Sequence, residues 1–323
     1  MPVHEFPAGE HHDVVINVTD EDLSVRGEGD QTILVNPKII RRYIHGGVRP
    51  PKTLLADFTC ITEGRPFSII DQEWRGITST VDPTLTMRNV DVHPWHGDHY
   101  SYAMHPIRIY GAWHPHIQNS LVRGRFNAPN FNDTSLAGIQ LENCVSVNCD
   151  HVTVYFCRAG IKGPSGTRVE GLRLTNSDVV WCRHGLALVG SPGHWPLQVA
   201  VQGSHFSVQK VAVSLGQVKD ASISNSYMMR TPETEGGDNV IFVHAHSGSQ
   251  YLRVHDNFFD NTAGRTPEKC YGVVFQNGVV HSQVHHNQGN HLIVGAWDQT
   301  RHPTNHLETF TGNVTHPIHP DNA

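Results

Sequence analysis

The segment between Asp91 and His116 concentrates residue types that can do chemistry. It reads DVHPWHGDHYSYAMHPIRIYGAWHPH and combines histidines, aromatic rings and a carboxylate. Asp98 and His99 are adjacent, and a carboxylate beside an imidazole can serve as an acid and base pair. Aromatic rings also form apolar platforms in ligand-binding grooves. The rings that could stack on sugars are Trp95, Tyr100 and Tyr102. The alternative is a loop that packs on its own rings or against a neighbouring subunit.

Histidines in this segment repeat with a spacing of three residues, at His93, His96 and His99. Imidazole nitrogens bind Zn, Ni or Fe, so a divalent metal could bind at His93 and His96. No carboxylate or cysteine completes a ligand set in the sequence, and histidines on the surface or in hydrogen bonds are the alternative. We therefore expect that no cofactor is required, with a divalent metal on this histidine cluster as the second interpretation.

Two stretches farther along the chain share the pattern Cys-Arg-x-Gly followed by Ile or Leu. They begin at Cys157 and Cys182 and lie 25 residues apart. On neighbouring turns of a repeating β structure, their cysteines would point inward and their arginines outward. Such guanidinium groups could clamp the carboxylates of an acidic glycan, with His184 as a base. The cations predicted to contact a glycan are Arg158, Lys162 and Arg183. The alternative is that nearby acids neutralise both arginines.

Hydrolysis of a glycosidic bond needs two carboxyl groups, about 5–5.5 Å or 6.5–9.5 Å apart depending on the stereochemical outcome. Glu142 and Asp178 lie near the middle of the chain and are the predicted catalytic carboxylates. A loop bounded by Pro and Gly presents Trp195, which could be a further platform for a sugar ring. The alternative is that these acids are solvated and that the loop has a structural role.

These residues are positioned by a sequence that repeats about every 28 residues, with alternating apolar residues on both sides of Asn or a small residue. The recurring positions are Asn89, Asn119, Cys149, Asn176, Gly203, Asn225, Asn257, Asn287 and Asn313. Short strands without a helical stripe predict a β-solenoid whose coils stack at about 4.8 Å. Asn suits a bend because it tolerates a left-handed backbone, and its amide can hydrogen-bond the Asn of the next coil.

Composition excludes several classes of partner. The 323 residues carry a net charge of -6 and include 25 histidines, but no block of Lys or Arg, so we expect no nucleic acid. No apolar stretch approaches 18 residues, so we expect no membrane partner. The first residues lack the apolar core of a secretory signal, so we expect no signal peptide. The protein then either works where it is made or leaves the cell by another route, such as cell lysis. The six cysteines form no CxxC pair and are expected to be buried free thiols.

Two short motifs near the start resemble the opening of the pectate-lyase-like superfamily of right-handed parallel β-helix proteins. The matching residues are Phe6, Pro7 and Gly9, followed by Gly27, Gly29, Thr32, Ile33 and Leu34. The resemblance implies an all-β fold, a single-stranded right-handed parallel β-helix of about ten turns. We predict that it spans residues 1–317, with a polar tail at 318–323.

The superfamily includes polysaccharide lyases, hydrolases, uronan epimerases and phage tailspikes, and this chain lacks the full motifs of the polygalacturonase-like hydrolases. The resemblance therefore favours a phage tailspike-like protein that binds a cell-surface polysaccharide, with cleavage left open. Such a protein is expected to be a homotrimer with other virion proteins as partners, in the virion tail or outside the cell after host lysis. The alternatives are a free-standing polysaccharide lyase, hydrolase or epimerase, and a non-catalytic virion decoration or adhesion module.

Overall fold

The computed structural model of the chain describes residues 2–44, 50–76, 82–95, 101–126, 131, 133–190, 196–231, 239–262, 270–299, 301–308 and 310–319. Within these ranges the regular structure is β-strand, apart from one short 3-10 turn, η1 (Gly29–Gln31). No helix in this part of the chain is long and apolar enough to cross a membrane. The chain divides into two units, Met1–Lys162 and Gly163–Ala323.

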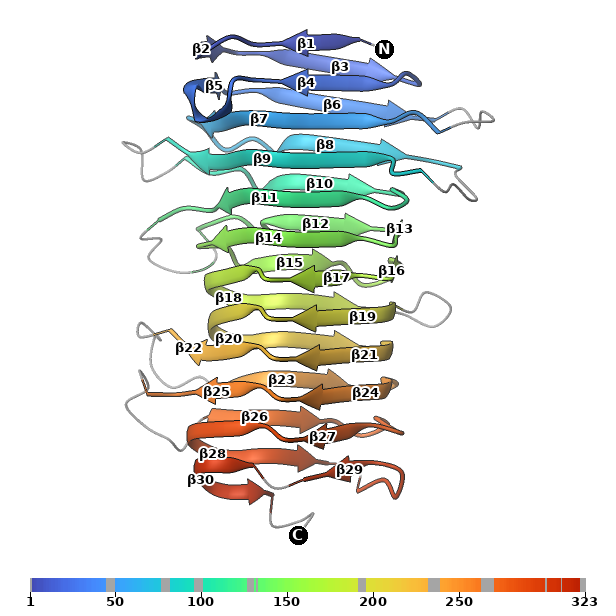
Figure 1. Ribbon diagram of the computed structural model, residues 1–323, viewed down its shortest axis with the longest axis vertical. Coiled ribbons are helices and arrows are strands. Elements are labelled where there is room, and N and C mark those ends of the chain that lie inside the picture. The colour runs from blue at the N-terminus through green and yellow to red at the C-terminus, as the bar shows by residue number, and fades with distance from the viewer. Residues whose placement is uncertain are drawn as a thin grey trace. The chain divides into compact units, whose positions relative to one another are not determined.

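The strands range from 2 to 10 residues in the first unit and from 2 to 12 in the second (Figure 1). Those of the first unit are β1 (Val3–Glu5), β2 (Gly9–His12), β3 (Val15–Thr19), β4 (Leu23–Arg26), β5 (Thr32–Val35), β6 (Lys38–Tyr43), β7 (Thr53–Thr62), β8 (Ser68–Trp74), β9 (Leu85–Pro94), β10 (His105–Tyr110), β11 (His116–Arg123), β12 (Ile139–Glu142), β13 (Cys144–Val145), β14 (Asn148–Tyr155) and β15 (Ala159–Gly163). Those of the second are β16 (Val169–Glu170), β17 (Arg173–Thr175), β18 (Asp178–Val189), β19 (Leu197–Gln202), β20 (His205–Gly216), β21 (Lys219–Ser224), β22 (Tyr227–Arg230), β23 (Val240–His246), β24 (Gln250–His255), β25 (Phe258–Asp260), β26 (Cys270–Phe275), β27 (Gln283–His285), β28 (Gln288–Asp298), β29 (His306–Leu307) and β30 (Thr311–Ile318).

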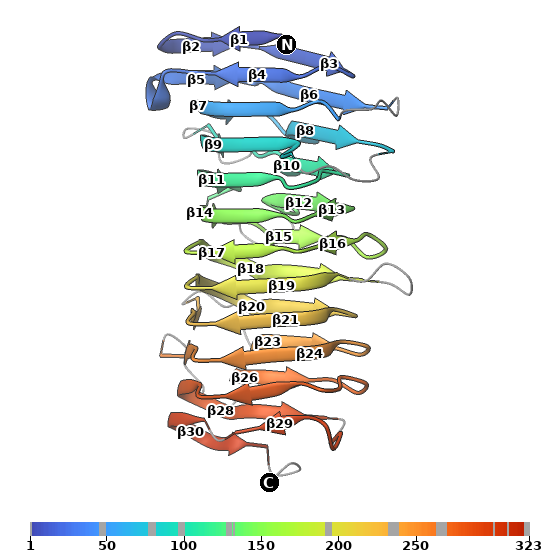
Figure 2. The same cartoon turned by 45° about the vertical axis from the view of Figure 1, so that its right-hand side comes forward.

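Strands pair in parallel with a strand one coil later, rather than with their neighbours in sequence. In the first unit, β6, β8, β10, β12 and β15 form one series, and β7, β9, β11 and β14 form another (Figure 2). In the second unit, β18, β20, β23, β26 and β28 form the equivalent of the first series. A backbone that returns once per coil in the same direction is a parallel β-helix, so the predicted fold class is confirmed in each unit.

Identical positions of successive coils lie under one another and fill the core. In the first unit, Ile39, Ile70, Ile107, Ile139 and Ile161 are in direct register and all fully buried. Burying each such side chain contributes about 2–3 kcal/mol. The second unit has an equivalent column, made of Leu186, Val213, Val243 and Val273. The columns fix the register of the strands, because a slip by one residue would expose the apolar set.

A left-handed residue marks one corner of each coil, with φ between 46° and 63°. These residues are Asp57, Asn89, Asn119 and His151 in the first unit, and Asn176, Gly203, Asn225, Asp256 and His286 in the second. The predicted Asn column is therefore correct at four positions, and at Gly203. It is wrong at Cys149, Asn257 and Asn287, because the bend falls two residues after Cys149 and one residue before each of the two asparagines.

The position just after the corner is buried and pairs the coils through side chains. The backbone N–H of Ser177 donates to Ser204 Oγ (3.3 Å), that of Ser204 to Ser226 Oγ (3.2 Å), and that of Ser226 to Asn257 Oδ1 (3.1 Å). Asn257 continues the series to Asn287 Oδ1, through its backbone and its amide, both at 3.0 Å. These bonds satisfy buried donors where the bend interrupts the strand ladder. The predicted Asn ladder thus exists at this pair.

The six cysteines are buried and free, as predicted. Cys157 and Cys182, which begin the two Cys-Arg stretches, both point into the core. Burial raises the pKa of Cys144 and of Cys149 to about 12, so these thiols stay protonated and unreactive. Packing also explains the glycine at position 185, because a Cβ there would lie 2.4 Å from Ala212 O.

We expect Asn257→Ala to lower the free energy of unfolding by about 2–4 kcal/mol, because it leaves the buried Ser226 N–H without an acceptor. It also removes the amide bonds to Ile223 O and Asn287 Oδ1. Urea unfolding followed by far-UV circular dichroism measures the change. The exposed strand residue Gln288, replaced by Ala, should change stability by less than about 0.5 kcal/mol. An equally small change for Asn257→Ala would show that the ladder does not stabilise the coils.

Candidate functional site

The outward face of β6, β8, β10, β12 and β15 carries a strip of charged and polar side chains. Strand register places Asp71, Arg108, Gln140 and Lys162 in one row across four of these strands. A parallel row holds Arg42, Glu73, Tyr110 and Glu142. Side chains alternate between the two faces of a strand, so both rows face away from the isoleucine column. We call these eight residues the charged strip.

Arg108 lies at the centre of the charged strip and holds two carboxylates. Its Nε is 2.9 Å from Glu142 Oε1, and its NH1 is 3.2 Å from Asp71 Oδ1. Arg42 extends the network, with NH2 2.6 Å from Asp71 Oδ2 and Nε 3.1 Å from Glu73 Oε2. The side chains of Asp71, Glu73 and Glu142 are only 10%, 8% and 15% exposed, so water screens these ion pairs weakly.

Lys162 lies at the end of the first row and differs from the other cations. Gln140 is its partner in the strand register, and the Gln140 amide donates to Glu142 Oε1 at 2.7 Å. Within the described ranges, Lys162 itself makes no salt bridge. It therefore leaves one positive charge on the strip available to an external anion.

His105 begins β10 and lies beside the charged strip. It is 7% exposed, and its Nδ1 has no hydrogen-bond partner in the described part of the chain. Burial, together with the nearby charge of Lys162, lowers its pKa to about 4. The imidazole is consequently neutral at physiological pH. The ring of Phe67 packs 5.2 Å from it, between ring centroids.

A cavity of about 550 Å³ opens beside the strip and is lined in part by Arg42, Asp71 and Phe67. Lys38 and Arg65 also line it. A volume of this size suits a small ligand or a segment of a longer one. Three cations around one aromatic ring favour a ligand that carries negative charge on an apolar body.

Two of the residues predicted from the sequence belong to the strip. Glu142, predicted as a catalytic carboxylate, is held by Arg108, and Lys162, predicted to bind substrate, is in the adjacent row. The structure thus brings these two together with Asp71 and His105. Their roles in catalysis and binding stay predictions.

Other predicted residues of the first unit lie elsewhere. Trp95 is exposed, but Tyr102 is buried, with the Arg65 guanidinium 5.0 Å from its ring centre. A sugar could stack on Tyr102 only if Arg65 moved. His93 Nδ1 lies 3.0 Å from Pro94 O and 3.5 Å from Arg123 NH2. Arg158 is exposed.

Five of the predicted residues lie outside the described ranges: His96, Asp98, His99, Tyr100 and Trp195. In the second unit, the predicted carboxylate Asp178 pairs with His205, with Oδ1 3.2 Å from Nδ1. Arg183 and His184 are half-buried on β18. The proposed stacking of Arg183 on Arg158 joins the two units and stays a prediction.

The sequence argument did not select Asp71, Arg108 or Arg42, and His105 entered it only as one of the histidines of the Asp91 to His116 segment. The alternation in SIIDQEW and HPIRIY would have placed Asp71 and Arg108 outward. Their pairing depends on the register between coils, which the variable connections conceal.

Comparison with known proteins supports the fold. No family model and no curated protein matches the sequence. The Dettilon tailspike protein matches the structure with a TM-score of 0.53 and 12% identity over 93% of this chain. This chain spans 61% of that tailspike's length. The A-module of the Azotobacter vinelandii mannuronan C-5 epimerase matches with a TM-score of 0.52 and 15% identity, covering 97% of this chain and 87% of the module. At these identities the likeness concerns the fold.

Because the imidazole of His105 is buried, we expect the free energy of unfolding to fall in acid. Its pKa is about 4 in the folded chain against an ordinary 6.5, so below about pH 6.5 protons bind preferentially to the unfolded chain. Its contribution is complete above that pH and is lost as the pH falls toward 4. Between about pH 7 and pH 4.5 the free energy of unfolding should fall less in His105→Gln than in the wild type, by on the order of 1–2 kcal/mol.

Urea unfolding of wild type and His105→Gln at several pH values measures this difference. The matched control is the same substitution at the exposed His12. Parallel stability curves for wild type and His105→Gln would contradict a neutral buried imidazole.

Proposed function

We propose that the protein binds an acidic polysaccharide at the charged strip and removes the C5 proton of a uronate residue there. The observation that carries this proposal is the position of Arg108, which bridges Asp71 and Glu142 on the strands at its two sides. Lys162 lies in the same row and makes no salt bridge with any residue that the structure describes. Cations on an outward strand face are what the carboxylates of a uronate polymer would contact.

The cations supply the first requirement of the reaction, neutralisation of the substrate carboxylate. Arg108 uses its Nε and NH1 within the protein, and a guanidinium has five N–H donors in all. Lys162 makes no internal salt bridge among the described residues. A uronate carboxylate placed between Lys162 and Arg108 would be stabilised as negative charge develops on it during loss of the C5 proton.

Proton transfer is the second requirement. His105 is a neutral imidazole beside the strip, and Tyr110 places a hydroxyl on the outward face two residues after Arg108. We assign His105 as the base and Tyr110 as the acid. Because the His105 Nδ1 is buried, substrate binding must displace its covering side chains for that nitrogen to react.

Hydrolysis fits the ion pairs less well. An inverting or retaining hydrolase needs one of its two carboxyl groups protonated to act as an acid. Glu142 Oε1 and Asp71 Oδ1 both accept hydrogen bonds from the Arg108 guanidinium, and Asp71 Oδ2 accepts one from Arg42, so both carboxyl groups are already engaged within the strip. Proton abstraction next to a carboxylate uses the same cations without this conflict. The epimerase neighbour, whose reaction is at C-5 of mannuronan, supports this choice.

The experiment is incubation of the full chain with polyuronates and with a neutral glucan in D₂O. Proton abstraction predicts deuterium at C5, seen by NMR, or the ultraviolet absorbance of an unsaturated uronate where elimination follows. We expect Lys162→Ala to weaken polyuronate binding about tenfold. We expect Arg108→Gln to lower turnover about 100-fold.

The matched control is Arg88→Gln, which removes an exposed guanidinium from β9, outside the strip. It should leave binding and turnover unchanged. Binding of the neutral glucan as tight as that of the polyuronates, or full turnover by Arg108→Gln, would overturn the proposal. New reducing ends without deuterium or unsaturation would indicate hydrolysis instead.

The tailspike neighbour favours a second candidate, a homotrimeric tailspike-like protein that acts on a virion tail or outside the cell after lysis. In this form the strip would bind the polysaccharide, with Asp71 and Glu142 as a hydrolytic pair on strands about 9.6 Å apart. Light scattering of the purified chain should then give a trimer, and the trimer should resist SDS without heating. A monomer would remove this candidate.

A further inference from the structure

We infer that His285, His286 and Glu308 form a binding site for a divalent first-row transition metal in the second unit. One ring nitrogen from each histidine and one carboxylate oxygen of Glu308 lie within 4.8 Å of one another. The site is independent of the charged strip, which belongs to the first unit.

The corner of the coil brings the two histidines together. His285 ends β27, and His286 is the left-handed corner residue, with φ of 52°. A strand normally directs successive side chains to opposite faces. The bend at His286 cancels that alternation, so both imidazoles face outward with their ring centroids 5.0 Å apart.

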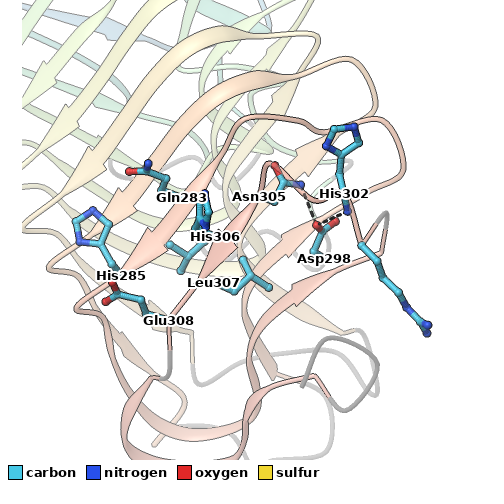
Figure 3. A pocket seen from close by; sticks show the side chains of 10 residues that line it. Gln283, His285, Asp298, His302, Asn305, His306, Leu307 and Glu308 are labelled. Atoms are coloured by element: carbon cyan, nitrogen blue, oxygen red, sulfur yellow. Dashed lines mark hydrogen bonds between the residues drawn. The ribbon is translucent and has the colours of Figure 1, made fainter.

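The next coil supplies the carboxylate. Val284 pairs with Leu307 in the register between β27 and β29. The following residues, His285 and Glu308, are therefore neighbours across adjacent coils. Figure 3 shows their side chains close together at one end of a cavity of about 740 Å³, which both residues line.

The distances suit a metal after a small adjustment of the side chains. His285 Nδ1 and His286 Nδ1 are 3.3 Å apart, and one nitrogen of each ring lies within 4.8 Å of one oxygen of Glu308. The other nitrogen of His286, Nε2, is 3.9 Å from Glu308 Oε2, so the His286 ring must turn for a single nitrogen to face both partners. Ligand atoms bound to one ion at about 2.0–2.2 Å lie roughly 3.0–3.6 Å apart. The side chains of His286 and Glu308 are 70% and 58% exposed, so both can rotate to close the remaining gap.

Neighbouring groups orient the ligands. The ring of His255 stacks on that of His285, with centroids 4.9 Å apart and planes inclined by 5°. His255 Nδ1 also lies 2.7 Å from Asp256 Oδ2, and Asp256 Oδ1 is 3.8 Å from His286 Nδ1. Asp256 therefore holds His255, on which His285 stacks, and places a carboxylate beside His286. Asp256 and Glu308 together balance the charge of a divalent cation.

The donor set determines the kind of ion. Two imidazole nitrogens and one carboxylate oxygen favour Zn²⁺, Ni²⁺ or Co²⁺, whereas Ca²⁺ and Mg²⁺ prefer oxygen ligands alone. Three protein ligands leave at least one coordination position open to water or a small ligand. Since His285 and Glu308 line the cavity, that position is reached from it.

The test is titration of the tag-free full chain with Zn²⁺ after chelator treatment, followed by calorimetry, and with Co²⁺, followed by its visible d–d bands. We expect one tight site per chain and an increase in thermal stability on binding. His286→Ala and Glu308→Gln should each weaken Zn²⁺ binding by about 10–100-fold.

The control is His281→Ala. His281 is an exposed histidine near the site, but it stacks on Tyr251 and is not one of the three proposed ligands. This variant should bind Zn²⁺ as the wild type does. The alternative is that the two Nδ1 atoms only share a hydrogen bond. Unchanged Zn²⁺ affinity in both His286→Ala and Glu308→Gln, or equal affinity for Ca²⁺ and Zn²⁺, would overturn the site. Activity on polyuronates is expected to be unaffected by either variant, so this test is separate from that of the charged strip.

Discussion

Parallel backbone hydrogen bonding at about 4.8 Å per coil is the constraint on which the rest of the structure depends. It places each residue beside the equivalent residue of the next coil. Apolar positions then become columns, such as the five isoleucines of the first unit, without any need for distant segments to find one another. The same spacing leaves no room for a Cβ at Gly185, where the backbone of the next coil approaches closely. Glycine is required there because a side chain would clash with Ala212 O, and not because the backbone has a positive φ.

The stacking also governs how charge can be placed on the outer faces. Like charges in adjacent coils would repel at close range, and the charged strip avoids this by alternating signs. Asp71 is followed by Arg108 in one row, and Arg42 by Glu73 in the other. The amide of Gln140 separates Arg108 from Lys162. A binding surface built in this way is preorganised, since Arg42, Arg108 and their carboxylate partners are already held by one another before a ligand arrives.

The β-helix fold was predictable because its cause is local. Alternation, the recurring bend and the two motifs near Phe6 and Gly27 are all visible along the chain. The bend itself was predicted at the wrong residue where Asp256 or His286 occupies the corner, since Asp and His, like Asn, are among the non-glycine residues that adopt the left-handed conformation most readily. The charged strip was harder, because Asp71 and Glu142 are far apart in sequence and meet only through register. Glu142 was identified by its type alone. The metal ligands were missed for the same reason, as Glu308 joins the two histidines only from the following coil.

The hydrogen bonds behind the corner have a direction. Four backbone N–H groups form this series, those of Ser177, Ser204, Ser226 and Asn257. Each donates to a side-chain oxygen of the following coil, and none of the four donates to a side chain of the preceding coil. Each coil is therefore completed only when its successor is in place. The two ends of a coil along the stack are therefore different. The end toward the preceding coil presents a side-chain oxygen as acceptor, and the hydroxyl hydrogens of Ser204 and Ser226 are already donated within their own coils. The end toward the following coil presents a backbone N–H that lacks an acceptor until that coil is added. A coil added during folding, or a cap that ends the stack on this side, must therefore supply a side-chain acceptor for that N–H.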